Sequence, residues 1–99
     1  MARQVMVHYR VKPDRVDEHE ALVREVFAEL GRTAPAGIRY GAFKRGDGVS
    51  FVHFAFITAD KNPLDSLAAF KAFAERIKER CDEMPRVVDL TEIGAFGLG

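Results

Sequence analysis

The sequence predicts an α+β fold in which two helices cover one face of a four-stranded antiparallel sheet. Strand and helix periodicities follow one another in the order strand, helix, strand, strand, helix, strand. A glycine-flanked turn at Gly46-Asp47-Gly48 joins the two middle strands, which makes that pair antiparallel. The run from Phe51 to Ile57 is apolar on both alternating faces, so it needs cover on two sides. With 99 residues, we expect one domain spanning residues 1–99.

The first strand and first helix are predicted from the N-terminal third of the chain. Residues 5–11 alternate in side-chain character and stop at Lys12-Pro13, which is typical of a strand. Asp14 is placed to cap a following helix, and Gly31 is placed to end it. The apolar stripe of this helix comprises Val16, His19, Leu22, Val23, Val26, Phe27 and Leu30.

The remaining elements follow from turn and cap signals. Ile38 to Lys44 and Phe51 to Ile57 are predicted as the hairpin strands, and Asn62-Pro63 begins a second helix. Its predicted apolar stripe is Leu67, Phe70, Phe73, Ala74, Ile77 and Cys81. Its predicted solvated residues are Lys71, Glu75, Arg76, Lys78, Glu79 and Arg80. Pro85 marks the expected end of the helix, and Val87 to Phe96 is the expected last strand.

This order is the ferredoxin-like split β-α-β arrangement, which leaves one face of the sheet without helices. We expect that open face to carry Met6, His8 and Arg10 from the first strand, and Phe51, His53, Ala55 and Ile57 from the third. The reverse choice for the first strand would bury His8 and Arg10 under the helices. A partner chain or a ligand would then have to cover the open face.

Composition excludes several functional classes. Fifteen basic residues balance fifteen acidic ones, so no global charge favours nucleic acid or an anionic membrane. We expect neither as a partner. The chain shows no secretory signal and no membrane-length apolar stretch, and its one cysteine, Cys81, cannot form an internal disulfide. These features predict a cytoplasmic protein in which Cys81 packs in the interior.

A series of short motifs resembles a known family. The first strand closes with Val11-Lys12-Pro13-Asp14, Pro35-Ala36-Gly37 leads into Ile38-Arg39-Tyr40, and Ala69-Phe70 lies near the start of the second helix. In this order, and over most of the chain, they resemble the antibiotic biosynthesis monooxygenase family of the dimeric α/β-barrel superfamily. The resemblance implies a homodimer in which two sheets pack face to face, and an apolar cavity between sheet and helices or near the dimer seam.

The chain departs from that family at positions tied to activity. Members that degrade haem or oxygenate polycyclic phenols use asparagine, tryptophan and histidine in the cavity, whereas this chain has no tryptophan. Ala55 and Phe56 stand where many relatives have an acid and a tryptophan, and Phe73 stands where a histidine is common. Asn62 is explained as a helix cap. Haem degradation is therefore disfavoured.

The candidate site residues are polar groups expected near the apolar faces. His8 and His53 are predicted to lie on adjacent strands, where a neutral imidazole could act as a base and Arg10 could stabilise an oxyanion. Alternatively, both histidines are partly buried interface residues bonded to backbone or water. Tyr40, Phe51 and His19 are candidate ligand-lining groups, and Tyr9 is expected to pack. No metal-ligand spacing is present.

Two functions remain open from the sequence. The first is a homodimeric protein that binds a small aromatic ligand and acts as a cofactor-independent monooxygenase on quinol-type substrates, with neither flavin nor metal. His8, His53 and Arg10 would be its catalytic groups, and Tyr40, Phe51 and His19 would contact substrate. The second is a non-catalytic dimeric binding or stress-response domain. One fold hosts many activities, so the fold does not choose between them.

Overall fold

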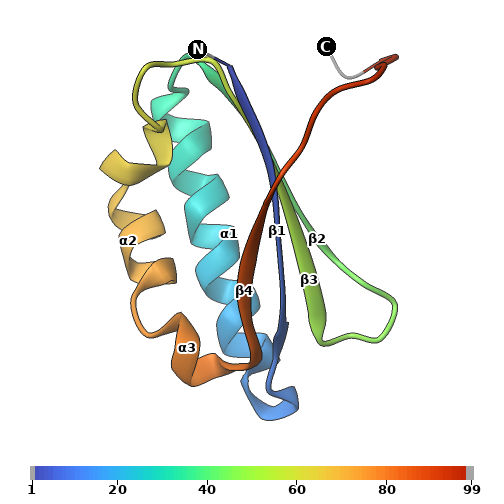
Figure 1. Cartoon of the computed structure of the whole chain (residues 1–99). Coiled ribbons are helices and arrows are strands. Elements are labelled where there is room, and N and C mark those ends of the chain that lie inside the picture. The colour runs from blue at the N-terminus through green and yellow to red at the C-terminus, as the bar shows by residue number, and fades with distance from the viewer. Residues whose placement is uncertain (1, 98–99) are drawn as a thin grey trace.

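The computed structural model describes residues 2–97 and places the helices on one face of a four-stranded sheet (Figure 1). The strands are β1 (Arg3–Val11), β2 (Ile38–Lys44), β3 (Ser50–Ile57) and β4 (Cys81–Asp89). The helices are α1 (Val16–Thr33), α2 (Ala68–Ala74) and α3 (Ile77–Arg80), with 3₁₀ turns at Pro13–Arg15 and Pro63–Ser66. The sheet order is β2-β3-β1-β4 with every pair antiparallel, which confirms the predicted ferredoxin-like fold.

The second helical region differs from the prediction of one continuous helix. α2 ends at Ala74, its C-cap residue Glu75 is extended, and Arg76 adopts the left-handed conformation with φ of 60° before α3 begins. Cys81 starts β4 and is buried, so its predicted packing is confirmed, although it packs from a strand. β4 therefore occupies Cys81–Asp89, and the predicted strand from Val87 to Phe96 was wrong in most of its length. Pro85 lies within this edge strand, where proline is tolerated.

Two of the three predicted helix caps also differ from those in the structure. Asp14 lies inside a 3₁₀ turn, so it does not cap α1. α1 continues through Gly31 and ends at Ala34, which takes the left-handed conformation with φ of 41° and donates its N–H to the Leu30 carbonyl. Asn62 behaves as predicted, because its side chain accepts a hydrogen bond from the Leu64 N–H at 3.0 Å.

The register of β1 and β3 corrects the predicted faces of the sheet. Val7 lies opposite His53, and Tyr9 lies opposite Phe51. Directly opposed residues point to the same side, so the predicted open-face residues of β3 lie under the helices with Val5, Val7 and Tyr9. The prediction for β1 was right, and the one for β3 was wrong. β3 is apolar on both sides, so its own pattern does not identify its buried face.

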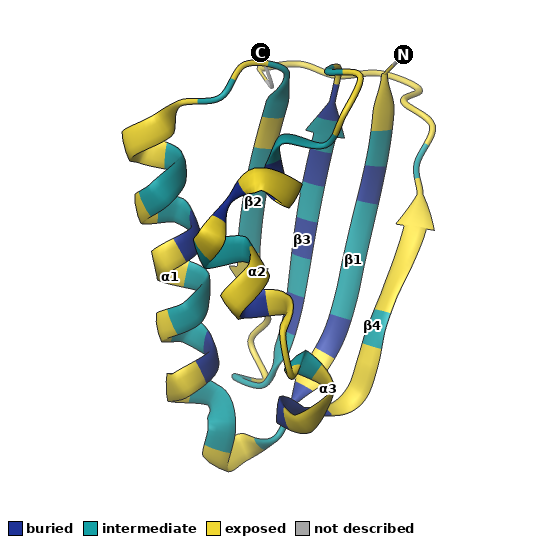
Figure 2. Ribbon diagram, turned by 90° about the vertical axis from the view of Figure 1, so that its left-hand side faces the viewer, coloured by how far each residue is buried: buried dark blue, intermediate teal, exposed yellow. Residues whose placement is uncertain are grey.

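The core lies between the sheet and the helices, where β1 and β3 carry alternating buried residues (Figure 2). The larger of its two buried apolar clusters comprises Tyr9, Val11, Val26, Phe51, Leu64, Leu67, Phe73 and Cys81, and the smaller one comprises Val5, Ala55 and Ile57. The edge strand β4 is largely exposed. No helix within residues 2–97 is both long and apolar enough to cross a membrane.

Gly37, in the turn before β2, provides a test of the backbone geometry. It has φ of 83°, and a Cβ added there would meet the Ala59 Cβ at 2.7 Å. We expect Gly37→Ala to lower the free energy of unfolding by roughly 1–3 kcal/mol, because both the backbone angle and the contact become unfavourable. Gly31→Ala, inside α1 with nothing within 4 Å of the added Cβ, should be neutral or stabilising. Denaturant titration of both variants would contradict this geometry if they lost equal stability.

Candidate functional site

A continuous line of hydrogen-bonded side chains crosses the core between the sheet and the helices. The Tyr9 hydroxyl lies 2.6 Å from His19 Nε2 and 2.7 Å from His53 Nε2. At one end, the Tyr40 hydroxyl lies 2.5 Å from His53 Nδ1. At the other end, Arg80 Nε donates to His19 Nδ1 at 3.1 Å. We call the line Tyr40–His53–Tyr9–His19–Arg80 the buried chain.

Five different elements supply these side chains. Tyr40 comes from β2, His53 from β3, Tyr9 from β1, His19 from α1 and Arg80 from α3. Tyr9 lies opposite Phe51 and Tyr40 lies opposite Ala55, so His53 is the diagonal neighbour of both tyrosines. Diagonal pairs on one face of a sheet are within reach of long side chains. The antiparallel register therefore brings these three polar rings together.

Aromatic packing holds the rings of the buried chain in place. The Tyr9 ring stacks on Phe51 with centroids 5.6 Å apart, and His19 meets the same Phe51 ring edge-on at 4.9 Å. Phe73 of α2 contacts both imidazoles, at 5.3 Å from His19 and 5.6 Å from His53. His19 and His53 are 0% and 4% exposed. Both rings are thus confined on all sides.

Arg80 is a buried cation whose guanidinium donates hydrogen bonds to backbone carbonyl groups. It is 2% exposed, and its terminal nitrogens donate to the Phe73 carbonyl at 2.5 Å and the Glu75 carbonyl at 3.2 Å. These carbonyls lie at the C-terminal end of α2, where the helix dipole favours a positive charge. Within residues 2–97, no ion pair links Arg80 to a carboxylate.

Burial keeps both histidines neutral. It lowers the pKa of His19 to about 4, with further lowering from the Arg80 and His53 charges, and it lowers the pKa of His53 to about 4. Burial raises the pKa of Tyr9 and of Tyr40 far above their usual range. At neutral pH the two rings and two phenols are therefore uncharged, and among residues 2–97 the charged group hydrogen-bonded to them is Arg80.

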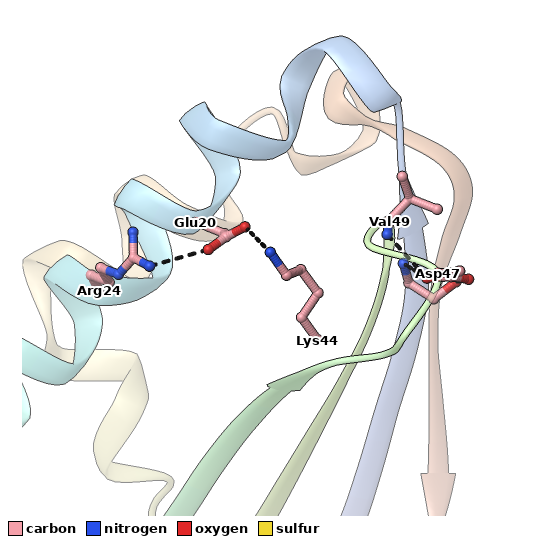
Figure 3. Close-up of polar contacts among 6 residues, drawn as sticks. Glu20, Arg24, Lys44, Asp47 and Val49 are labelled. Atoms are coloured by element: carbon pink, nitrogen blue, oxygen red, sulfur yellow. Dashed lines mark hydrogen bonds and ion pairs between the residues drawn. The ribbon is translucent and has the colours of Figure 1, made fainter.

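A groove between α1 and β2 leads toward the Tyr40 end of the buried chain. It has a volume of about 340 Å³, and its walls are mainly the apolar residues Val23, Phe27, Ala42, Phe43 and Phe51. Its rim is charged: Glu20 of α1 pairs with Lys44 of β2 at 2.7 Å and with Arg24 at 3.2 Å (Figure 3).

Phe27 separates this groove from the buried chain. Its ring stacks on Tyr40 with centroids 5.2 Å apart and planes 13° from parallel. Behind it, the space bounded by Val26, Tyr40, His53 and Phe73 is too small to admit a water molecule. A ligand in the groove would therefore reach Tyr40 only if the Phe27 ring moved aside.

The structure brings together four of the six predicted site residues. His53, His19, Tyr40 and Phe51 meet around the buried chain, whereas His8 and Arg10 lie on the opposite face of the sheet. Arg10 pairs there with Glu83 at 2.6 Å. The expectation that His8 and His53 share a face was wrong, because the β1–β3 register places His8 opposite Val52.

Sequence reasoning missed Arg80 and underrated Tyr9. Arg80 was expected in solvent and Tyr9 was expected only to pack. A signal for Arg80 existed, since Phe73, Ile77 and Arg80 recur at helical spacing on the predicted apolar stripe. No group of three or more His, Cys, Asp or Glu side chains within residues 2–97 is arranged to hold a metal ion.

The neutral histidines make stability depend on pH. Their pKa of about 4 in the folded chain lies below the ordinary 6.5, so the unfolded chain binds more protons in this interval. We expect the free energy of unfolding to be highest above pH 6.5 and to fall by roughly 2 kcal/mol per histidine between pH 7 and 5. Denaturant titrations at a series of pH values test this. His8→Ala is the matched control, and its free energy of unfolding should fall by the same amount as that of the unmodified protein. A free energy of unfolding that did not change between pH 7 and 5 would contradict buried neutral histidines.

Removing the central hydroxyl should cost more stability than removing the terminal one. Tyr9→Phe leaves two buried imidazole nitrogens without partners, and Tyr40→Phe leaves one. Each such group costs roughly 1–3 kcal/mol. We therefore expect Tyr9→Phe to lose about twice as much free energy of unfolding as Tyr40→Phe. Equal losses in denaturant titration would show that Tyr9 does not join the two histidines.

Comparison with known proteins identifies structural relatives. No family model and no curated protein matches the sequence. Rv0793 from Mycobacterium tuberculosis matches with a TM-score of 0.76 at 17% identity, covering 96% of this chain and 98% of its own. An antibiotic biosynthesis monooxygenase matches at 0.71 and 23% identity, over 95% and 100% of the two chains. SnoaB, a cofactor-independent oxygenase from Streptomyces nogalater, matches at 0.66 and 16% identity, over 97% of each.

These similarities extend over nearly the whole of each chain, but the low sequence identities limit them to architecture. The predicted resemblance is therefore confirmed at the level of the fold. The chain has the ferredoxin-like α+β fold of antibiotic biosynthesis monooxygenases.

Proposed function

We propose that this protein binds a small planar aromatic molecule in the groove between α1 and β2 and oxygenates it without a cofactor. The observation that carries the proposal is the Tyr40 end of the buried chain, because the Tyr40 ring stacks on Phe27 and Phe27 lines an apolar groove. A dry site with few, well-placed polar groups is the usual form of a small-molecule site. The shared fold of SnoaB, a cofactor-independent oxygenase, supports the choice of reaction.

The ligand would enter by displacing the Phe27 ring. Phe27 stacks nearly parallel on Tyr40, so an aromatic ligand whose edge meets the Tyr40 hydroxyl would take up the space that Phe27 leaves and keep the site free of water. The groove outside has a volume of about 340 Å³, which lies in the range of small-molecule sites. The Tyr40 hydroxyl would then meet the polar edge of the ligand, because both nitrogens of His53 are already bonded to the two tyrosines.

The chemistry would rely on the substrate itself. An anthrone- or quinol-type substrate that has lost a proton can pass an electron to oxygen directly. With an anthrone, one oxygen atom becomes the carbonyl oxygen of the former CH₂ carbon, and the other leaves as water with the two hydrogens that this carbon loses. The protein would stabilise the substrate oxyanion through Tyr40 and exclude bulk water, which favours charge stabilisation by fixed dipoles.

We further propose that the open face of the sheet is covered by a second copy of this chain. Its apolar side chains include Met6, Phe43, Val52, Phe54 and Val88, and Phe43 is 58% exposed. The sheet-to-sheet dimer that the resemblance implies would bury this surface, at roughly 25 cal/mol per Å² of apolar area. His8 and Arg10 would then belong to the dimer interface.

A non-catalytic binding domain is the second candidate. The closed space behind Phe27 favours it, because no room for a substrate ring exists next to Tyr40 before Phe27 moves. In that case the buried chain serves only to satisfy the polar groups of the core.

Oxygen uptake with an anthrone as substrate separates the two functions. We expect turnover by the unmodified protein, a loss of tenfold or more in kcat for Tyr40→Phe, and unchanged turnover for His8→Ala, which lies on the other face of the sheet. Tyr40→Phe should still bind the anthrone in a fluorescence titration. If the unmodified protein bound the anthrone without oxygen uptake, only the function as a non-catalytic binding domain would remain. If it did not bind the anthrone at all, both proposed functions would be contradicted.

Sedimentation equilibrium tests the dimer. At micromolar concentration we expect a dimer for the unmodified chain and a folded monomer for Phe54→Glu, because a carboxylate would be buried in the shared apolar surface. Glu92→Gln, outside the sheet, is the control for altered charge and should remain a dimer. A monomeric unmodified protein would overturn this part of the proposal.

A further inference from the structure

Arg80 is the only member of the buried chain whose hydrogen-bonding role is fixed by its chemistry. A guanidinium has five N–H donors and no acceptor, and it does not lose a proton in proteins. Arg80 Nε lies 3.1 Å from His19 Nδ1. His19 Nδ1 must therefore accept this bond, and the neutral ring carries its hydrogen on Nε2.

The hydrogen position on His19 fixes which atom donates in each of the remaining hydrogen bonds of the buried chain. His19 Nε2–H donates to the Tyr9 oxygen at 2.6 Å, so the Tyr9 O–H has one remaining ring to donate to, which is His53 through Nε2 at 2.7 Å. The neutral His53 then carries its hydrogen on Nδ1 and donates it to the Tyr40 oxygen at 2.5 Å. Each donor has one acceptor, and all four bonds run in the same direction.

The last hydrogen is that of the Tyr40 hydroxyl, and it is not used inside the chain. Tyr40 receives the bond from His53, and within residues 2–97 no protein acceptor for the Tyr40 O–H is found. The Tyr40 ring lies against Phe27, which lines the groove. The unused hydrogen is therefore available to a ligand that displaces Phe27.

We propose that Arg80 is a positioning residue that fixes the direction of the buried chain, so that Tyr40 donates its hydrogen to the ligand. The site then selects molecules that present an oxygen acceptor, namely a phenolate, an enolate or a quinone carbonyl. The direction of the chain stands on the geometry alone, whereas the choice of ligand rests on the proposed function.

The same direction assigns His53 the role of a donor, in place of the base predicted from the sequence. A proton added to His53 would occupy Nε2, which is the atom that accepts the Tyr9 O–H. Tyr9 would then face N–H groups from both histidines, and its own hydrogen would have no acceptor in a buried position. A substrate proton would have to leave by another route, such as to water in the groove before closure.

Nitrogen-15 NMR of the histidine rings tests the direction directly in the unmodified protein. Long-range nitrogen–proton correlations distinguish an N–H nitrogen from an acceptor nitrogen in each ring. At neutral pH we expect the hydrogen on Nε2 of His19 and on Nδ1 of His53. His8, on the opposite face, provides the reference ring. The reverse pattern in either buried ring, or two hydrogens on one ring, would overturn the inference.

Arg80→Met tests whether Arg80 is the cause. The substitution removes the donor and keeps an unbranched side chain. The hydrogen bonds of the buried chain are then free to reverse their direction, and we expect an NMR signal from the Nε2–H form of His53 to appear. If Arg80→Met does not fold, His19→Phe breaks the same link, and His53 should lose its fixed form. An unchanged His53 pattern in the folded variant would show that Arg80 does not set the direction.

Ligand binding supplies the separate test of selectivity. We expect 1,4-naphthoquinone, which has only acceptor oxygens, to bind the unmodified protein about tenfold more tightly than naphthalene, and Tyr40→Phe to remove this preference. Arg80→Met should reduce the preference while leaving the Kd of naphthalene unchanged, which a general loss of structure would not do. Equal affinities in the unmodified protein would refute the selectivity. Failure of both compounds to bind would count against the proposed function and leave the ring tautomers to decide the direction.

Discussion

The hydrogen bond from Arg80 to His19 sets the donor-to-acceptor direction of the hydrogen bonds among the polar side chains of the core. A buried cation usually requires a carboxylate, but here two carbonyls at the C-terminal end of α2 and one imidazole nitrogen take that place. This arrangement requires the break between α2 and α3. Arg76 adopts a left-handed conformation, α3 turns back, and Arg80 reaches the carbonyls of the helix that precedes it. The strained turn and the buried charge are therefore parts of one local structure.

The two faces of the sheet differ in the side chains they carry and in the roles proposed for them. The helix-covered face holds the tyrosines and the buried histidines in a dry interior, where both nitrogens of His19 and of His53 are hydrogen-bonded, and it has a groove at its α1–β2 edge. The open face is apolar and carries His8 and Arg10. Alternation along β1 and β3 separates them, since neighbouring residues such as His8 and Tyr9 point to opposite sides. A change at the open face can thus alter assembly without touching the buried chain.

Sequence patterns predicted the elements better than the site. Alternation, helical spacing and the Gly46-Asp47-Gly48 turn were enough for the order of strands and helices, because each signal is local. The face of β3 depends on its register with β1, which no periodicity within β3 reports. Arg80 was missed for a similar reason: a charged residue is normally solvated, and only the return of α3 onto the end of α2 supplies the carbonyls that hold it. His19 and Tyr40 were candidates from the sequence, because a ring with a polar group beside apolar positions can line a ligand site, and the structure places both in the buried chain.

Five side chains thus form one uninterrupted hydrogen-bonded line that ends on the buried guanidinium of Arg80, which pairs with no carboxylate within residues 2–97. A high-resolution crystal structure at neutral pH tests it most directly. The account predicts direct contacts within hydrogen-bond distance from Tyr40 through His53, Tyr9 and His19 to Arg80, with the guanidinium on the Phe73 and Glu75 carbonyls. A water molecule between Tyr9 and either histidine, or an Arg80 side chain turned outward to pair with Glu18 or Glu79, would contradict it.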